Sequence, residues 1–151
     1  MDRQRLQVIS NAHAGPGFSL VELLIVLAII AITTSFAIPS YVDYVRRSKL
    51  VEAVMLLEDY RSKMETFFAD TGSYGNGSCG VALPQGRFFS FKCDLSSPSQ
   101  FVAYATSRAD SGLGGDGSYE YAIDSFGSKR TMTFRGNPSG AHCWLFRGDE
   151  C

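Results

Sequence analysis

The sequence predicts an α+β fold in which one long N-terminal helix packs on an antiparallel sheet of about four strands. Residues 18–38 hold 16 apolar residues in 21. No glycine lies between residues 18 and 71, whereas 13 of the 15 glycines follow. Beyond Gly72 the apolar pattern changes from a helical period to alternation. A chain of 151 residues has room for one such domain.

The apolar run matches the thickness of a bilayer, because 21 helical residues span about 31 Å. Basic residues flank both ends, so the positive-inside pattern assigns no orientation. A plain membrane anchor and a cleaved secretory signal are two interpretations. A third interpretation is needed that accounts for Glu22, because a carboxylate near a bilayer centre costs about 2.5–3.5 kcal/mol unless it is paired.

The helix is expected to continue over residues 41–69 with an amphipathic pattern. Its apolar side chains recur at the helical period and should face the core. They are Leu50, Ala53, Val54, Leu57, Tyr60, Met64, Phe67 and Phe68. The sequence Asp70-Thr71-Gly72 is the expected stop, with Gly72 as a left-handed cap.

The remaining residues predict the sheet. Short aromatic or β-branched runs indicate strands. They cover residues 87–93, 101–108, 119–124 and 129–134, and residues 143–146 are a candidate edge strand. Residues 124–128 predict a hairpin connection, and residues 71–87 form the loop that follows the helix.

Four cysteines lie in this second part: Cys79, Cys93, Cys143 and Cys151. Their even number indicates disulfides, and three pairings are open. Proximity favours Cys79–Cys93 and Cys143–Cys151, the first of which closes a 15-residue loop worth about 3 kcal/mol. Thiolate metal binding with His142 lacks close ligand spacing, so no metal site is predicted.

The start of the apolar run carries the motif GFSLVEL at residues 17–23, followed by Pro39-Ser40-Tyr41. This combination resembles the class III signal of type IV pilins and related filament subunits. The resemblance implies the type IV pilin fold, with a C-terminal loop that is closed by a disulfide and is similar to the D-region of pilins. The pattern is most similar to that of a minor pilin.

The resemblance divides the chain into a cleaved leader (1–17), a transmembrane or filament-core helix (18–40), an amphipathic helix (41–71) and a globular head (72–151). It implies that prepilin peptidase cuts between Gly17 and Phe18 and that Phe18 is then N-methylated. Glu22 would pair with the N-terminal ammonium of a neighbouring subunit during assembly. Pro39 would kink the helix, although Ala31 stands where the family often has glycine.

The implied function is that of a structural subunit of a type IV pilus, major or minor, serving twitching motility, adhesion or DNA uptake. The implied partners are other pilin subunits, prepilin peptidase and the assembly platform with its ATPase. The precursor would reside in the inner membrane and the product in an extracellular filament. The alternatives are a pseudopilin of a type II secretion system and a pilus-displayed DNA-binding subunit.

Other motifs predict no enzyme and no cofactor. Residues 112–117 match GxGxxG but precede a strand-like run, which is not the context of a dinucleotide site. Asp110, Asp116 and Asp124 are candidate calcium ligands without an EF-hand pattern. A basic cluster beside Phe134, Trp144 and Phe146 is a candidate nucleic-acid surface. Its members are Lys129, Arg130, Arg135, Arg147 and Lys92.

Overall fold

The computed structural model describes residues 17–148, 150 and 151. Its elements are α1 (Leu20–Thr71), β1 (Phe89–Ser97), β2 (Gln100–Ser107), a 3-10 helix η1 (Ala109–Ser111), β3 (Glu120–Asp124), β4 (Lys129–Phe134) and β5 (Asn137–Ala141). The chain divides into two compact units, residues 1–40 and 41–151. The expected leader lies outside the described residues except for Gly17.

In the first unit, the apolar part of α1 exposes its large side chains, from 46% for Val26 to 77% for Phe36. The hydroxyls of Thr33, Thr34 and Ser35 donate to backbone carbonyls three or four residues earlier. These weak helix formers therefore stay helical with their polar groups satisfied. Pro39 lies inside the continuous helix, and the kink expected there stays a prediction.

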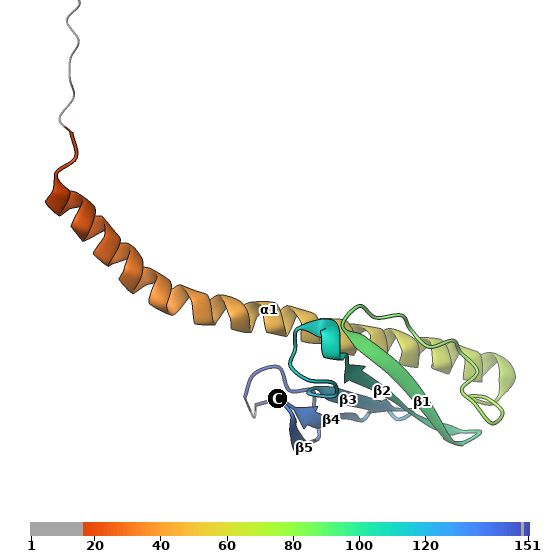
Figure 1. Ribbon diagram of the computed structural model, residues 1–151. Coiled ribbons are helices and arrows are strands. Elements are labelled where there is room, and N and C mark those ends of the chain that lie inside the picture. The colour runs from red at the N-terminus through yellow and green to blue at the C-terminus, as the bar shows by residue number, and fades with distance from the viewer. Residues whose placement is uncertain (1–16, 149) are drawn as a thin grey trace, which may run out of the picture. The chain divides into compact units, whose positions relative to one another are not determined.

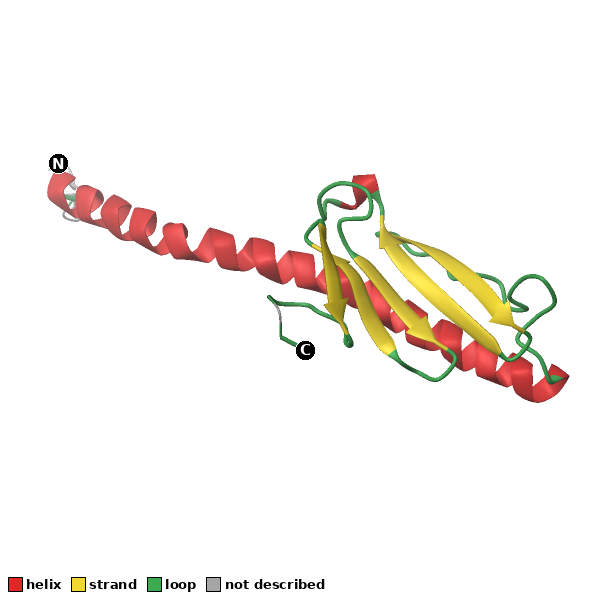
Figure 2. Ribbon diagram, turned by 90° about the horizontal axis from the view of Figure 1, so that it is seen from below, coloured by secondary structure: helices red, strands yellow, loops and turns green. Residues whose placement is uncertain are grey.

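In the second unit, the sheet lies along the amphipathic part of α1 (Figures 1 and 2). The predicted stripe is confirmed at its centre: Leu50, Ala53, Leu57, Tyr60 and Met64 are at most 1% exposed. Three other members of the predicted stripe, Val54, Phe67 and Phe68, are only partly buried. The helix ends at Thr71, and Gly72 has the predicted positive φ of 75°.

The sheet has five antiparallel strands in the order β1-β2-β3-β4-β5. The predicted α+β architecture is confirmed, with one strand more than expected. Strand β2 alternates as predicted, because Phe101, Ala103, Ala105 and Ser107 are buried and the residues between them are not. The register pairs Ala105 with Tyr121, so the buried side chains of β2 and β3 share the face that packs on α1.

The prediction of an edge strand at residues 143–146 is wrong. Strand β5 occupies that edge, pairing Thr131 with Ala141 and Phe134 with Asn137. Sequence patterning missed β5 because it contains Pro138, which lacks an N–H and is tolerated in an edge strand.

Two turns fix the hairpins around β4. The Asp124 carboxylate accepts the N–H groups of Phe126 and Ser128, at 3.0 and 2.9 Å, which confirms the predicted connection. Arg135 and Gly136 both have positive φ, 54° and 77°, as a two-residue hairpin loop of type I′ requires. This second turn presents Arg135 at its tip.

Candidate functional site

The apolar segment forms the first candidate surface. By length and composition, α1 contains a stretch that could cross a membrane, and none of that stretch is buried. Glu22 lies in its first turn, where an acidic side chain suits the helix dipole. The segment therefore combines a fully exposed apolar surface with one carboxylate near its end.

The amphipathic part of α1 carries a second exposed apolar surface. Tyr41, Tyr44, Val51 and Met55 are 40–69% exposed and recur at steps of three, seven and four residues. That spacing places them on one side of the helix. The sheet packs against the opposite side of the helix, where Leu57, Tyr60 and Met64 are buried, so the helix offers apolar contacts on two faces.

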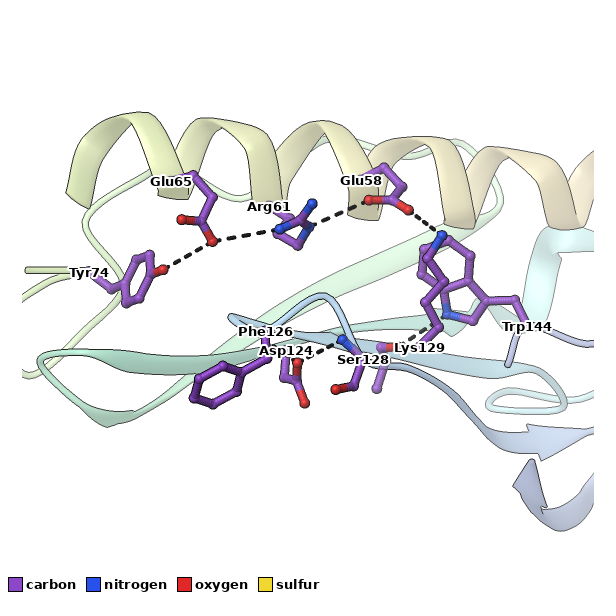
Figure 3. Close-up of polar contacts among 10 residues, drawn as sticks. Glu58, Arg61, Glu65, Tyr74, Asp124, Phe126, Ser128, Lys129 and Trp144 are labelled. Atoms are coloured by element: carbon purple, nitrogen blue, oxygen red, sulfur yellow. Dashed lines mark hydrogen bonds and ion pairs between the residues drawn. The ribbon is translucent and has the colours of Figure 1, made fainter. Parts of the chain in front are cut away.

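A chain of polar contacts ties the helix to the head (Figure 3). The Lys129 ammonium lies 2.6 Å from a Glu58 carboxylate oxygen. Arg61 lies 3.6 Å from Glu58 and 3.7 Å from Glu65. The Tyr74 hydroxyl donates to Glu65 at 3.0 Å, and burial and this carboxylate raise the pKa of Tyr74. The contacts link β4, α1 and the loop after α1.

The structure contains two disulfides, Cys79–Cys93 and Cys143–Cys151, which is the pairing that proximity favours. Their Cα–Cα distances are 6.3 and 5.7 Å. The first bond attaches the loop after α1 to β1. The second closes the C-terminal loop, defined here as residues 143–151, on itself.

Side chains of the sheet hold the start of the C-terminal loop. The buried Thr131 hydroxyl donates to the Cys143 carbonyl at 2.6 Å and accepts the Leu145 N–H at 3.0 Å. The Tyr121 hydroxyl donates to the Leu145 carbonyl at 2.6 Å, and burial raises the pKa of Tyr121 so that it keeps its proton. The Trp144 indole N–H donates to the Ala122 carbonyl at 3.1 Å.

The predicted basic cluster forms only in part. Lys92 lies on β1, which β2 and β3 separate from β4, so it does not join the others. Lys129 is engaged by Glu58 and lies 4.6 Å from the centre of the Trp144 ring. Arg130 lies 3.9 Å from Asp124. The sequence could not reveal Lys129 as a structural cation, because Glu58 is distant along the chain.

Arg135 and Arg147 remain as exposed cations. Neither has an ion-pair partner among the residues that the structure describes. The Arg135 guanidinium lies 5.6 Å from the centre of the Phe134 ring. A groove of about 350 Å³ runs between the β4–β5 turn and the C-terminal loop, lined by Arg135, Leu145 and Gly148 among others. This end of the head is the candidate nucleic-acid interface.

The aromatic neighbours do not form the expected stacking surface. Trp144 and Phe134 are 9% and 8% exposed, and Phe146 is partly buried beside Tyr121. These rings belong to the core, so contacts with a nucleic acid would come mainly from the arginines.

The remaining motifs have structural roles. The GxGxxG match at residues 112–117 is a loop that follows η1. Gly112, Gly114 and Gly117 have positive φ there, which explains the glycines without a phosphate. Asp124 caps the β3–β4 turn, and the described residues contain no group of three or more metal-binding side chains.

Comparisons with known proteins agree with this architecture. A family model described as "Type IV minor pilin ComP, DNA uptake sequence receptor" matches residues 39–135. The "Prokaryotic N-terminal methylation motif" matches residues 16–38. The solved structure of the non-core minor pilin PilV of Neisseria meningitidis aligns with a TM-score of 0.51 and 19% identity, over 66% of this chain and 91% of that one. That likeness shows the fold.

Curated relatives match about half of the chain. The chain is 40% identical over 70 residues to the type IV major pilin protein PilE1 of Neisseria gonorrhoeae, which is 45% of this chain and 42% of that protein. It is 34% identical over 97 residues to the type IV major fimbrial protein FimA of Dichelobacter nodosus, 55% of this chain and 61% of that one. The match thus spans about half the length of these relatives. The family model covers most of the chain, which therefore belongs to the family of the type IV minor pilin ComP, the DNA uptake sequence receptor.

Proposed function

We propose that this minor pilin is a DNA receptor that is displayed on a type IV pilus. The family's description supports the binding of DNA. The observation that carries the proposal is the exposed Arg135, which lines the groove between the β4–β5 turn and the C-terminal loop, together with the exposed Arg147 of that loop. Lysine and arginine contacts to phosphates supply a large share of the affinity of proteins for DNA.

The apolar helix serves assembly in this proposal. Prepilin peptidase cuts between Gly17 and Phe18, Phe18 is N-methylated, and the chain passes from the inner membrane into the filament. The match to the methylation motif and the exposed apolar surface support this route. The same surface contacts lipid first and neighbouring subunits afterwards.

Glu22 is proposed to set the register of assembly. A carboxylate surrounded by apolar helices is costly unless a positive partner lies beside it. The new N-terminal ammonium of a neighbouring subunit would be such a partner. The pairing would favour one axial position of each subunit over all others.

The DNA-binding proposal is tested with the full chain in detergent. Anisotropy of a labelled duplex, cut from chromosomal DNA of the host, is measured over a series of salt concentrations. Replacing Arg135 and Arg147 by glutamine should weaken binding. It should also lower the slope of log K against log salt by about one unit for each phosphate that the variant no longer neutralises.

The matched control removes two charges elsewhere. Lys63 and Lys92 are 62% and 71% exposed and lie on α1 and β1, so the K63Q/K92Q variant should keep the wild-type slope. Equal slopes for the two double variants would show that the arginines do not bind the phosphates. A wild-type chain that binds no DNA would overturn the proposed function.

A further inference from the structure

The second disulfide does not attach the C-terminal loop to the sheet. Both of its cysteines, Cys143 and Cys151, belong to the loop, so the bond closes a ring without attaching that ring to a strand. The isolated bridge between Arg147 and Glu150 also lies within the loop. Another set of contacts must therefore fix where the loop lies over the head.

That set consists of side chains on β3 and β4. Thr131 and Tyr121 are partners in the ladder, so they share the face that packs on α1. Between them they satisfy both backbone groups of Leu145, through bonds of 3.0 and 2.6 Å. The Thr131 hydroxyl also donates to the Cys143 carbonyl, so one side chain holds two residues of the loop.

Trp144 supplies a third attachment. Its indole N–H donates to the Ala122 carbonyl, and the Lys129 ammonium lies over its ring. Glu58 of α1 holds that ammonium. The segment from Cys143 to Leu145 is thus anchored on two strands and, through Lys129, on the helix.

We propose that Thr131, Tyr121 and Trp144 are positioning residues for DNA binding, because they hold the C-terminal loop where Arg147 can act together with Arg135. The inference rests on the proposed function. The hydrogen-bonded anchors end at Leu145, and the groove beside Arg135 is lined by Leu145 and Gly148. A loop that leaves its anchors moves Arg147 away from the turn while its ring stays closed.

The test uses two substitutions of Thr131. Thr131→Val keeps the shape but removes the hydroxyl, so the buried N–H of Leu145 and the carbonyl of Cys143 lose their partner. Thr131→Ser keeps the hydroxyl and removes a methyl group. Thr133→Val is the matched control on the same strand, because Thr133 makes no side-chain hydrogen bond in the part of the chain that the structure describes.

DNA affinity is read by anisotropy with the same labelled duplex. If the docked fraction of the loop falls to a tenth, the apparent Kd rises about tenfold. We expect this of Thr131→Val, whereas Thr131→Ser and Thr133→Val stay near wild type. The salt slope should stay unchanged, because both arginines still contact DNA in the bound state. The arginine variants, in contrast, lower the slope.

A second readout needs no DNA. Trp144 is the sole tryptophan of the chain and is 9% exposed, so its fluorescence reports whether the loop is docked. Thr131→Val should expose the Trp144 ring and increase the quenching of its fluorescence by acrylamide. Should that variant not fold, Tyr121→Phe removes one bond to Leu145, with Tyr104→Phe as its control.

The outcomes separate the two proposals. DNA binding that Thr131→Val leaves intact overturns the positioning role alone. The same holds if Thr131→Ser behaves like Thr131→Val, because packing and not the hydroxyl would then matter. Absence of DNA binding by the wild-type chain overturns the proposed function, and the positioning role with it.

Discussion

Gly80 shows how closely single residues are fitted in the loop after α1. A Cβ atom placed at Gly80 would overlap the ring of Phe67, which belongs to the helix. A cysteine of the first disulfide, Cys79, is its direct neighbour. Hence the loop can approach the helix only because this position lacks a side chain.

Replacing Gly80 by alanine should therefore lower the free energy of unfolding by about 1–3 kcal/mol, the usual cost of overpacking. Urea denaturation measures the change. Gly140→Ala is the matched control, because a Cβ at Gly140 meets nothing within 4 Å. Similar losses in both variants would mean that the Phe67 ring gives way.

Glu22 carries a second prediction at this scale. Glu22→Ala should abolish incorporation into filaments while leaving peptidase cleavage largely intact, because the carboxylate is proposed to act after processing. Mass spectrometry of membranes and of sheared filaments measures the two steps. Ser40→Ala, an exposed polar position of the same helix, is the control. Normal incorporation of the Glu22 variant into filaments would contradict the proposal that Glu22 sets the register of assembly.

Among the elements, the β3–β4 hairpin depends on one side chain. The Asp124 carboxylate accepts two backbone N–H groups of the turn and lies near Arg130. Such a local cap lets the turn form without help from the rest of the sheet. It also sets the start of β4, and with it the place of Lys129.

Asp124→Ala should cost about 1–2 kcal/mol of unfolding free energy, since the two N–H groups lose their acceptor. Thermal and urea denaturation measure this. Asp116→Ala removes an exposed aspartate from the loop before β3 and should change stability by less than about 0.5 kcal/mol. If the two variants are equally stable, the turn does not depend on Asp124.

The sequence pattern predicted the helices and strands that follow from the spacing of neighbouring residues along the chain. The helical stripe through Leu57 and the alternation of β2 follow from spacing alone. Strand β5 was missed because Pro138 and its small neighbours carry no strand signal. The path of residues 143–146 was predicted wrongly, since it depends on the distant hydroxyls of Thr131 and Tyr121. The basic cluster was only half predicted for the same reason, because Lys129 meets a distant carboxylate.

In the second unit as a whole, the burial of three tyrosines makes the free energy of unfolding depend on pH. Burial raises the pKa of Tyr60, Tyr74 and Tyr121 above their ordinary value of 10.0. The unfolded chain thus releases these protons at lower pH than the folded one. Above that pH the unfolded state binds fewer protons, and the free energy of unfolding falls as pH rises.

We expect the contribution of these tyrosines to the free energy of unfolding to be independent of pH below about pH 9 and to decline above about pH 10. Urea midpoints over this range measure the decline. The decline should be shallower in Tyr121→Phe, because one of the three groups no longer ionises. An unchanged slope in that variant would show that Tyr121 contributes no part of the pH dependence.

The hydrogen bonds that anchor the C-terminal loop end at Leu145, before the exposed residues of the loop. The loop therefore stands on the head as a hypervariable loop stands on an antibody framework. Sequence between Phe146 and Glu150 can change in length and chemistry while the framework residues remain untouched. A peptide grafted there would be carried outward at every position that this subunit occupies, which makes this ring the natural place to engineer a filament for display.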